Sequence, residues 1–222
     1  MKKVIAILLV TGFSVSMFSC KTLNKSQKGA IIGAGAGGAV GAGVGKAAGN
    51  TALGAIIGAT VGGVAGGIIG KQMDKAAEEI EQIPGAEVTR VGEGINVTFD
   101  SGVLFSLDSD DLSSDAETKL NELTGILNKY PDTYILVEGH TDASGSDSHN
   151  NKLSKERAQS VSEFLERNAI ADSRIKTKWY GEDQPKYPND SADNMAKNRR
   201  VEFAIYANEE MVDKAQEQAS GR

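Results

Sequence analysis

Two stretches of this chain place a glycine at every fourth position, and this period restricts the folds open to them. Residues 29–46 read GAIIGAGAGGAVGAGVGK and residues 54–71 read GAIIGATVGGVAGGIIGK, with eleven of eighteen aligned positions identical. Positions i and i+4 share one face of a helix, so each copy would carry a glycine seam. Glycine costs about 1 kcal/mol relative to Ala in an exposed helix. The pattern therefore favours helices that approach another backbone closely.

Residues 29–71 are accordingly predicted to form a hairpin of two close-packed helices, resembling glycine-zipper modules, with a turn at 49–50. Each copy would rise about 26 Å at 1.5 Å per residue, which is marginal for crossing a bilayer core of about 30 Å. Spanning a thin membrane, lying on it, and self-association through Gly29–Gly70 all stay open. The alternatives are a flexible Gly-rich linker and a nucleotide loop, which would need a preceding strand that the sequence lacks.

The first twenty residues have the organisation of an export signal. Lys2 and Lys3 precede an apolar run that ends in a small residue and then Cys20, the only cysteine of the chain. The run is short for a membrane span, and its flanks are those of a secretory signal. MFSC at this place resembles the end of a bacterial lipoprotein signal sequence. The resemblance implies a signal peptide over residues 1–19, acylation of Cys20 with fatty chains such as palmitate, and a tether over residues 20–28.

Charge divides the chain near residue 71. The formal net charge is −6, but the first 71 residues contain seven Lys and no acid, so the remainder is strongly acidic. Nucleic-acid binding depends on neutralising phosphates, so no nucleic-acid partner is expected for this acidic body. The basic start instead suits anionic lipid near the anchor.

After residue 85 the pattern changes to that of an α+β domain, a layered α/β sandwich whose mixed sheet carries helices on one face. Alternating apolar residues predict strands, and apolar stripes at helical spacing predict helices. The strands are expected at 87–91, 95–99, 134–139, 175–181 and 200–207, and the helices over 116–130, capped by Ser114, and from about Asn150. Residues 72–85 are predicted to be a linker, 86–208 the domain, and 209–222 a disordered tail.

The polar stretch after strand 134–139 holds the strongest candidate for a site. The strand delivers Thr141 and Asp142 at its C-terminal end, the edge where open α/β sheets bind ligands. The helix from Asn150 places Arg157 about one turn past Leu153, near the same end. An acid and a guanidinium flanking one cleft suit a ligand that has both an ammonium and a carboxylate. A direct Asp142–Arg157 ion pair, with Asn150 as a helix cap, is the structural alternative.

Catalysis is less well supported by the same residues. Ser144, His140 and Asp142 are neighbours in sequence and lack the G-x-S-x-G turn of a nucleophile elbow. Two histidines nine residues apart, without a nearby cysteine, make a poor metal site. We therefore expect no enzymatic activity, no metal and no cofactor.

The stretch GHTDASGSDSHNNKLSKERAQSV resembles the signature of the OmpA-like, peptidoglycan-associated domain. The shared pattern is Thr-Asp, a Gly three positions on, and then Asn-x-x-Leu-Ser-x-x-Arg-Ala-x-x-Val. VTFDSGVLFSLDSDDL, YGEDQP and NRRVEF extend the resemblance over residues 86–207. It implies non-covalent binding of the cell-wall stem peptide, with Asp142 and Arg157 gripping its diaminopimelate residue. His149 stands where the family usually has Tyr, and Arg200 is expected to be an auxiliary contact.

Two functional hypotheses follow from these patterns. In the first, the protein is a lipoprotein of the outer membrane that faces the periplasm and tethers that membrane to peptidoglycan. In the second, the glycine zipper is a membrane-active or self-assembling module, and the wall-binding domain only localises it. A cell-wall hydrolase would need a base, metal or nucleophile that the sequence does not offer.

Overall fold

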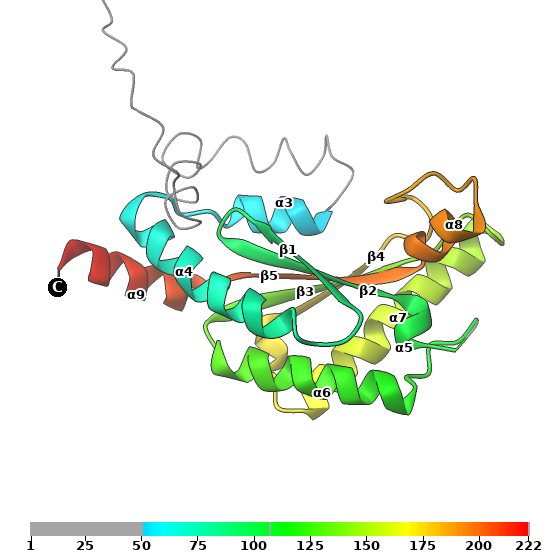
Figure 1. The fold of residues 1–222 in the computed structure, drawn as a ribbon, viewed down its shortest axis with the longest axis horizontal. Helices are drawn as coiled ribbons and strands as arrows, with labels where there is room; N and C mark the ends of the chain where they lie inside the picture. The colour runs from blue at the N-terminus through cyan, green and yellow to red at the C-terminus, as the bar shows by residue number, and fades with distance from the viewer. Residues whose placement is uncertain (1–50, 107, 222) are drawn as a thin grey trace, which may run out of the picture.

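Five strands form one mixed sheet in the order β1-β2-β5-β3-β4 (Figure 1). The computed structural model describes residues 51–106 and 108–221. Neighbouring strands run antiparallel except β3 and β4, which are parallel. The strands are β1 (Ala86–Val91), β2 (Gly94–Asp100), β3 (Thr133–His140), β4 (Ile175–Trp179) and β5 (Arg200–Ala207).

The larger core lies on the sheet face that carries Val97, Val137 and Phe203, here called the α6/α7 face. Helices α6 (Ser114–Lys129) and α7 (Asp147–Arg167) cover it, and α4 (Gly63–Ile80) lies beside α6. Each covering helix is amphipathic, so its apolar stripe is removed from water against the strands. The predicted α+β class with a mixed sheet is confirmed. The cap of α6 is Ser113, whose hydroxyl accepts from the Ala116 amide at 3.1 Å, one residue before the predicted cap.

The opposite sheet face carries a helix that the sequence did not predict there. Helix α3 (Thr51–Gly58) lies across the strands on the other side of the sheet from α6 and α7 (Figure 1). Its Ala52 and Ile56 are buried against Leu136 and Ala204, and this side is here called the α3 face. Helices therefore cover both faces rather than the one face predicted, because the second glycine copy supplies a cover for the second face.

The predicted linker over residues 72–85 is wrong. Helix α4 continues to Ile80, and its buried side chains recur at helical spacing through the core. They include Ile69, Met73, Ala76, Ala77 and Ile80, each at most 3% exposed. This apolar stripe crosses the boundary that the change in composition suggested, so the domain takes in the end of the glycine repeat.

The C-terminal segment is also helical rather than a disordered tail. Helix α9 (Glu209–Ser220) begins at Asn208, whose side chain accepts from the Met211 amide at 3.0 Å. Met211 and Ala215, one turn apart, are buried, and α9 packs on α4. Two anchoring side chains and a capped first turn order a segment that is otherwise polar.

The predicted continuous helix over the second glycine copy is broken in two. Helix α3 ends at Gly58 and α4 begins at Gly63, with positive φ values at Gly62 and Gly63. The Glu93 carboxylate accepts from the Val61 and Gly62 amides at 2.7 and 2.8 Å. Glycine tolerates the left-handed backbone of this break, and the buried carboxylate stabilises the start of α4.

The predictions for the signal peptide, Cys20, the tether and the first glycine copy lie outside the described residues. Within the described ranges, none of the helices is long and apolar enough to span a membrane.

Candidate ligand-binding site

A cavity of about 530 Å³ opens at the C-terminal end of β3. It is bounded by the loop after β3, by α5 (Ser101–Leu104), by the first turns of α7 and by the end of α8 (Ala192–Asn198). Its volume lies within the range of small-ligand pockets. The structure brings five of the predicted site residues to its wall: Thr141, Asp142, Asn150, Leu153 and Arg157.

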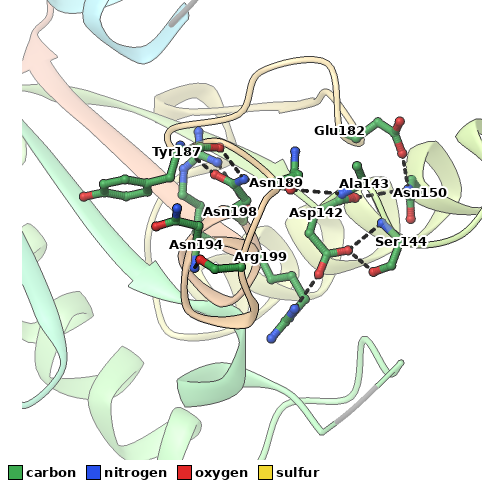
Figure 2. Close-up of polar contacts among 12 residues, drawn as sticks. Asp142, Ala143, Ser144, Asn150, Glu182, Tyr187, Asn189, Asn194, Asn198 and Arg199 are labelled. Atoms are coloured by element: carbon green, nitrogen blue, oxygen red, sulfur yellow. Dashed lines mark hydrogen bonds and ion pairs between the residues drawn. The ribbon is translucent and has the colours of Figure 1, made fainter.

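Asp142 presents a fixed carboxylate at one side of the cavity. Its Oδ1 accepts from the Ser144 amide at 2.9 Å and from the Ser144 hydroxyl, and its Oδ2 forms an ion pair with Arg199 (Figure 2). Burial raises the pKa of Asp142, but the hydrogen bonds from Ser144 and the ion pair with Arg199 lower it by more, so the pKa lies below its ordinary value. Gly145, with φ of 101°, allows the loop to turn back toward α7. Because the pKa of Asp142 is lowered, its carboxylate is ionised at neutral pH.

Arg157 provides a buried guanidinium on the wall formed by α7. Its Nε donates to the Ser109 carbonyl at 2.9 Å, and its guanidinium carbon lies 5.3 Å from the centre of the Phe105 ring. Burial lowers the pKa of Arg157, and the nearby Asp108 opposes that shift. Within the described residues, the hydrogen bonds of Arg157 use Nε alone. Its two Nη groups are therefore available to a carboxylate in the forked geometry that guanidinium favours.

The direct Asp142–Arg157 ion pair does not form. Among the described residues Asp142 pairs with Arg199 instead, and the cap of α7 is Ser146 rather than Asn150. The site thus holds two separate guanidinium groups and a carboxylate around one cavity.

Arg200, predicted as the auxiliary contact, does not line the cavity, whereas Arg199 does. Arg200 is 2% exposed and pairs with Glu202 on the α3 face. Side chains alternate along a strand, so Arg200 and Glu202 share one face while Val201 points to the other. Arg199 lies two positions before Val201 and so points to the same side as Val201, away from Arg200. This alternation is the sequence signal that could have identified Arg199 as the arginine at the cavity.

Thr141 and Asn150 shape the floor of the cavity. The Thr141 hydroxyl is buried and has no hydrogen-bond partner within the described residues, although its amide donates to the Gly181 carbonyl at 2.8 Å. Asn150 is 2% exposed and donates to the Asp142 carbonyl at 3.2 Å and to the Glu182 carboxylate. An unpartnered buried hydroxyl beside a charged pair is a donor and acceptor that a ligand can satisfy.

The rim is closed on one side by His149. Its Nε2 lies 3.0 Å from Oδ1 of Asp108, a residue with φ of 54° in the loop after α5. The contact joins the first turn of α7 to that loop across the cavity mouth. His149 therefore forms a wall of the cavity.

A buried asparagine fixes the second loop at this end of the sheet. Asn198, 0% exposed, accepts from the amides of Lys186 and Tyr187 at 2.9 Å and donates to the side chain of Asn189 at 2.9 Å. Asn189 in turn accepts from the Ala143 amide at 3.3 Å (Figure 2). This chain of contacts holds the backbone next to Asp142 in place. Asn198 begins the NRRVEF stretch of the family pattern, but that pattern did not indicate these contacts.

The residues considered for catalysis do not assemble. The Ser144 hydroxyl donates a hydrogen bond to Asp142. His140 is instead 1% exposed and stacks on Tyr180, with 5.5 Å between the ring centres. Neither ring nitrogen of His140 has a hydrogen-bond partner within the described residues. Burial and Arg200 lower the pKa of His140 to about 3, so the ring is neutral. Residues 51–106 and 108–221 contain no cluster of three His, Cys, Asp or Glu side chains placed to hold a metal ion.

The fold is an α/β domain with a mixed sheet and a cavity of small-ligand size at one end of it. Comparison with known proteins identifies its family. The OmpA family model matches residues 104–199, and a model described as YMGG-like Gly-zipper matches residues 1–74. A peptidoglycan-associated lipoprotein from Mesorhizobium japonicum is 32% identical over 117 residues, which are 53% of this chain and 70% of that protein. The chain belongs to the OmpA family.

A further relative agrees with this assignment, and solved structures share the fold. The probable lipoprotein YiaD of Escherichia coli is 35% identical over 121 residues, which are 54% of this chain and about half, 55%, of that protein. The structure of the cell wall anchor of the T6SS from Pseudomonas aeruginosa superposes with a TM-score of 0.55 at 25% identity, over 61% of this chain and 97% of that one. A putative MotB-like protein from Desulfovibrio vulgaris gives a TM-score of 0.56 at 24% identity, over 65% and 92% of the two chains.

Proposed function

We propose that this protein is a non-enzymatic anchor that binds peptidoglycan through the diaminopimelate residue of the stem peptide. The observation that supports it best is that Asp142 and Arg157 both line the cavity without pairing with each other. Diaminopimelate ends in an ammonium and a carboxylate on one carbon. The Asp142 carboxylate accepts from the ammonium, and the free Nη groups of Arg157 donate to the carboxylate. The unpartnered hydroxyl of Thr141 satisfies one further polar atom.

We further propose that acylated Cys20 anchors the chain in the outer membrane, so that the domain faces the periplasm and links that membrane to the wall. The relatives named as lipoproteins support this arrangement. Acyl chains contribute about 0.8 kcal/mol per buried CH₂, and more than one chain gives a stable anchor.

The test is co-sedimentation of the full chain, in detergent, with purified peptidoglycan sacculi. Asp142→Asn and Arg157→Ala each remove one charged contact, which is worth about 1.5–3 kcal/mol, so binding should weaken by roughly 10-fold or more. Asp115→Asn and Arg167→Ala, which alter exposed partners of surface ion pairs, should bind as the unaltered chain does.

Ligand chemistry provides the second arm of the test. A soluble stem peptide with diaminopimelate should compete with sacculi, whereas the same peptide with lysine should compete far less, because lysine lacks the second carboxylate. Equal competition by both peptides, or full retention of both site variants, would contradict the proposal. Release of soluble fragments from the sacculi would instead indicate a hydrolase.

A further inference from the structure

Helix α3 is apolar on all sides, but among its described side chains only Ala52 and Ile56 are fully buried. Its sequence is TALGAIIG, in which every residue after the first is apolar or glycine. Ala52 and Ile56 face the sheet and are at most 1% exposed. On the outer side, no other described atom lies within 4 Å of the position that a Cβ would take on Gly58. A helix that is hydrophobic all round is normally buried all round.

An open groove of about 420 Å³ continues from the uncovered flank of α3. Ala55 and Gly58 form its α3 side, and Val212 of α9 lines it further on. Tyr134 and Tyr206 lie between them, with ring centres 5.7 Å apart. The uncovered side of α3 and this groove are here called the α3 groove. Its small residues allow a backbone to approach closely, and its aromatic rings supply apolar area.

A candidate to fill the α3 groove stands immediately before α3 in the sequence. Residues 29–46 repeat the glycine period of the second copy, and only four residues, 47–50, separate them from Thr51. A connection of this length joins antiparallel neighbouring helices. A helix of 18 residues extends about 27 Å and α3 about 12 Å. The first copy would therefore pass along α3 and beyond Gly58, over the rest of the groove.

Charge favours the same direction. An antiparallel first copy places Lys25 and Lys28, which precede it, beyond the far end of α3. That end of the groove is lined by Glu209 and Asp213 in the first turns of α9. Lys176 also lies there, with its ammonium 4.7 Å from the centre of the Tyr134 ring. The two carboxylates outnumber Lys176, so this end of the groove attracts the lysines at the start of the first copy.

We propose that the first glycine copy, residues 29–46, docks in the α3 groove of its own chain. The two copies then form a hairpin that is one layer of the wall-binding domain. This docking also sets the position of the domain relative to Cys20, because the chain between them is bound to the domain rather than free to extend. The proposal does not depend on the ligand of the cavity.

The test is cross-linking of the full chain carrying Cys20→Ser, purified in detergent, with a short bismaleimide. Lys28→Cys with Asp213→Cys places thiols at the predicted meeting point. Lys28→Cys with Asp115→Cys is the control, because Asp115 is exposed on α6 on the other side of the sheet. Docking raises the effective concentration of the first pair, so its intramolecular product should exceed that of the control by roughly fivefold or more.

A third variant adds Gly58→Leu to the first pair. The space outside Gly58 is open within the described residues, so the domain should keep its thermal midpoint while the cross-link yield falls several-fold. Equal yields in the two cysteine pairs, or a yield unaffected by Gly58→Leu, would overturn the proposal. Cross-linked dimers as the main product would assign the groove to a second copy of the chain. Loss of the product in phosphatidylglycerol vesicles would assign it to lipid.

Discussion

A buried carboxylate on the α3 face should make this domain less stable as the pH rises. Glu138 is 0% exposed and stands opposite Glu202 in the register between β3 and β5. Burial and Glu202 raise its pKa from 4.5 to about 7, although Lys178, the Ala52 amide and Tyr180 lower it in part. The described structure holds Glu138 where a neutral carboxyl is favoured over a carboxylate.

The size of the effect follows from the two pKa values. In the unfolded chain Glu138 loses its proton near pH 4.5, whereas in the folded chain it keeps the proton until about pH 7. Between these values the folded state binds more protons, so raising the pH favours unfolding. The shift corresponds to about 3 kcal/mol, fully lost above the folded pKa. Glu138→Gln keeps the shape and cannot ionise, so it should remove this loss.

The measurement is urea unfolding of both proteins at pH 5 and pH 8.5. The free energies of unfolding of the variant and the unaltered chain should differ by about 1 kcal/mol or less at pH 5, and the variant should be more stable by up to about 3 kcal/mol at pH 8.5. Other titrating groups cancel in this difference because both proteins contain them. A variant that is less stable by the same amount at both pH values would refute the reasoning, since it would show that the Glu138 carboxylate is favourably solvated in the fold.

Three further predictions address the neighbouring residues. At pH 4 the His140 ring is neutral in the folded chain and protonated in the unfolded chain, which favours unfolding. His140→Phe cannot take up this proton, so it should be more stable than the unaltered chain by about 3 kcal/mol at pH 4, as measured by acid unfolding curves. Gly139→Ala should lower the free energy of unfolding by about 3 kcal/mol or more, since its Cβ would lie 2.1 Å from a backbone oxygen of α7. Gly102→Ala has open space around the new Cβ and should change the stability little. Thermal melts of both variants measure the difference. Arg199→Ala should raise the pKa of Asp142, detected by NMR titration, and an unchanged pKa would contradict the role of this ion pair.

The sequence by itself determined the local elements and most of the site. Period-2 and period-3.6 patterns placed the five strands and the two central helices, because alternation and apolar stripes follow from backbone geometry. The residues from Thr141 to Arg157 also lie close in the chain. A strand end, a glycine turn and a helix start therefore bring Asp142 and Arg157 to one cavity without distant contributions.

Tertiary structure decided which segments belong to the domain and which partners the charges take. The boundary near residue 86 was drawn from composition, yet the buried stripe of α4 and the capping of Gly62 by Glu93 incorporate the glycine repeat. A glycine-rich helix has few side chains that indicate its partner, so only the sheet that it meets determines its burial. Asp142 pairs with Arg199, 57 residues away, because β5 lies beside β3 in the sheet and brings the residue before it to this edge. Strand order depends on packing of the whole core, and no local pattern in this sequence encodes it.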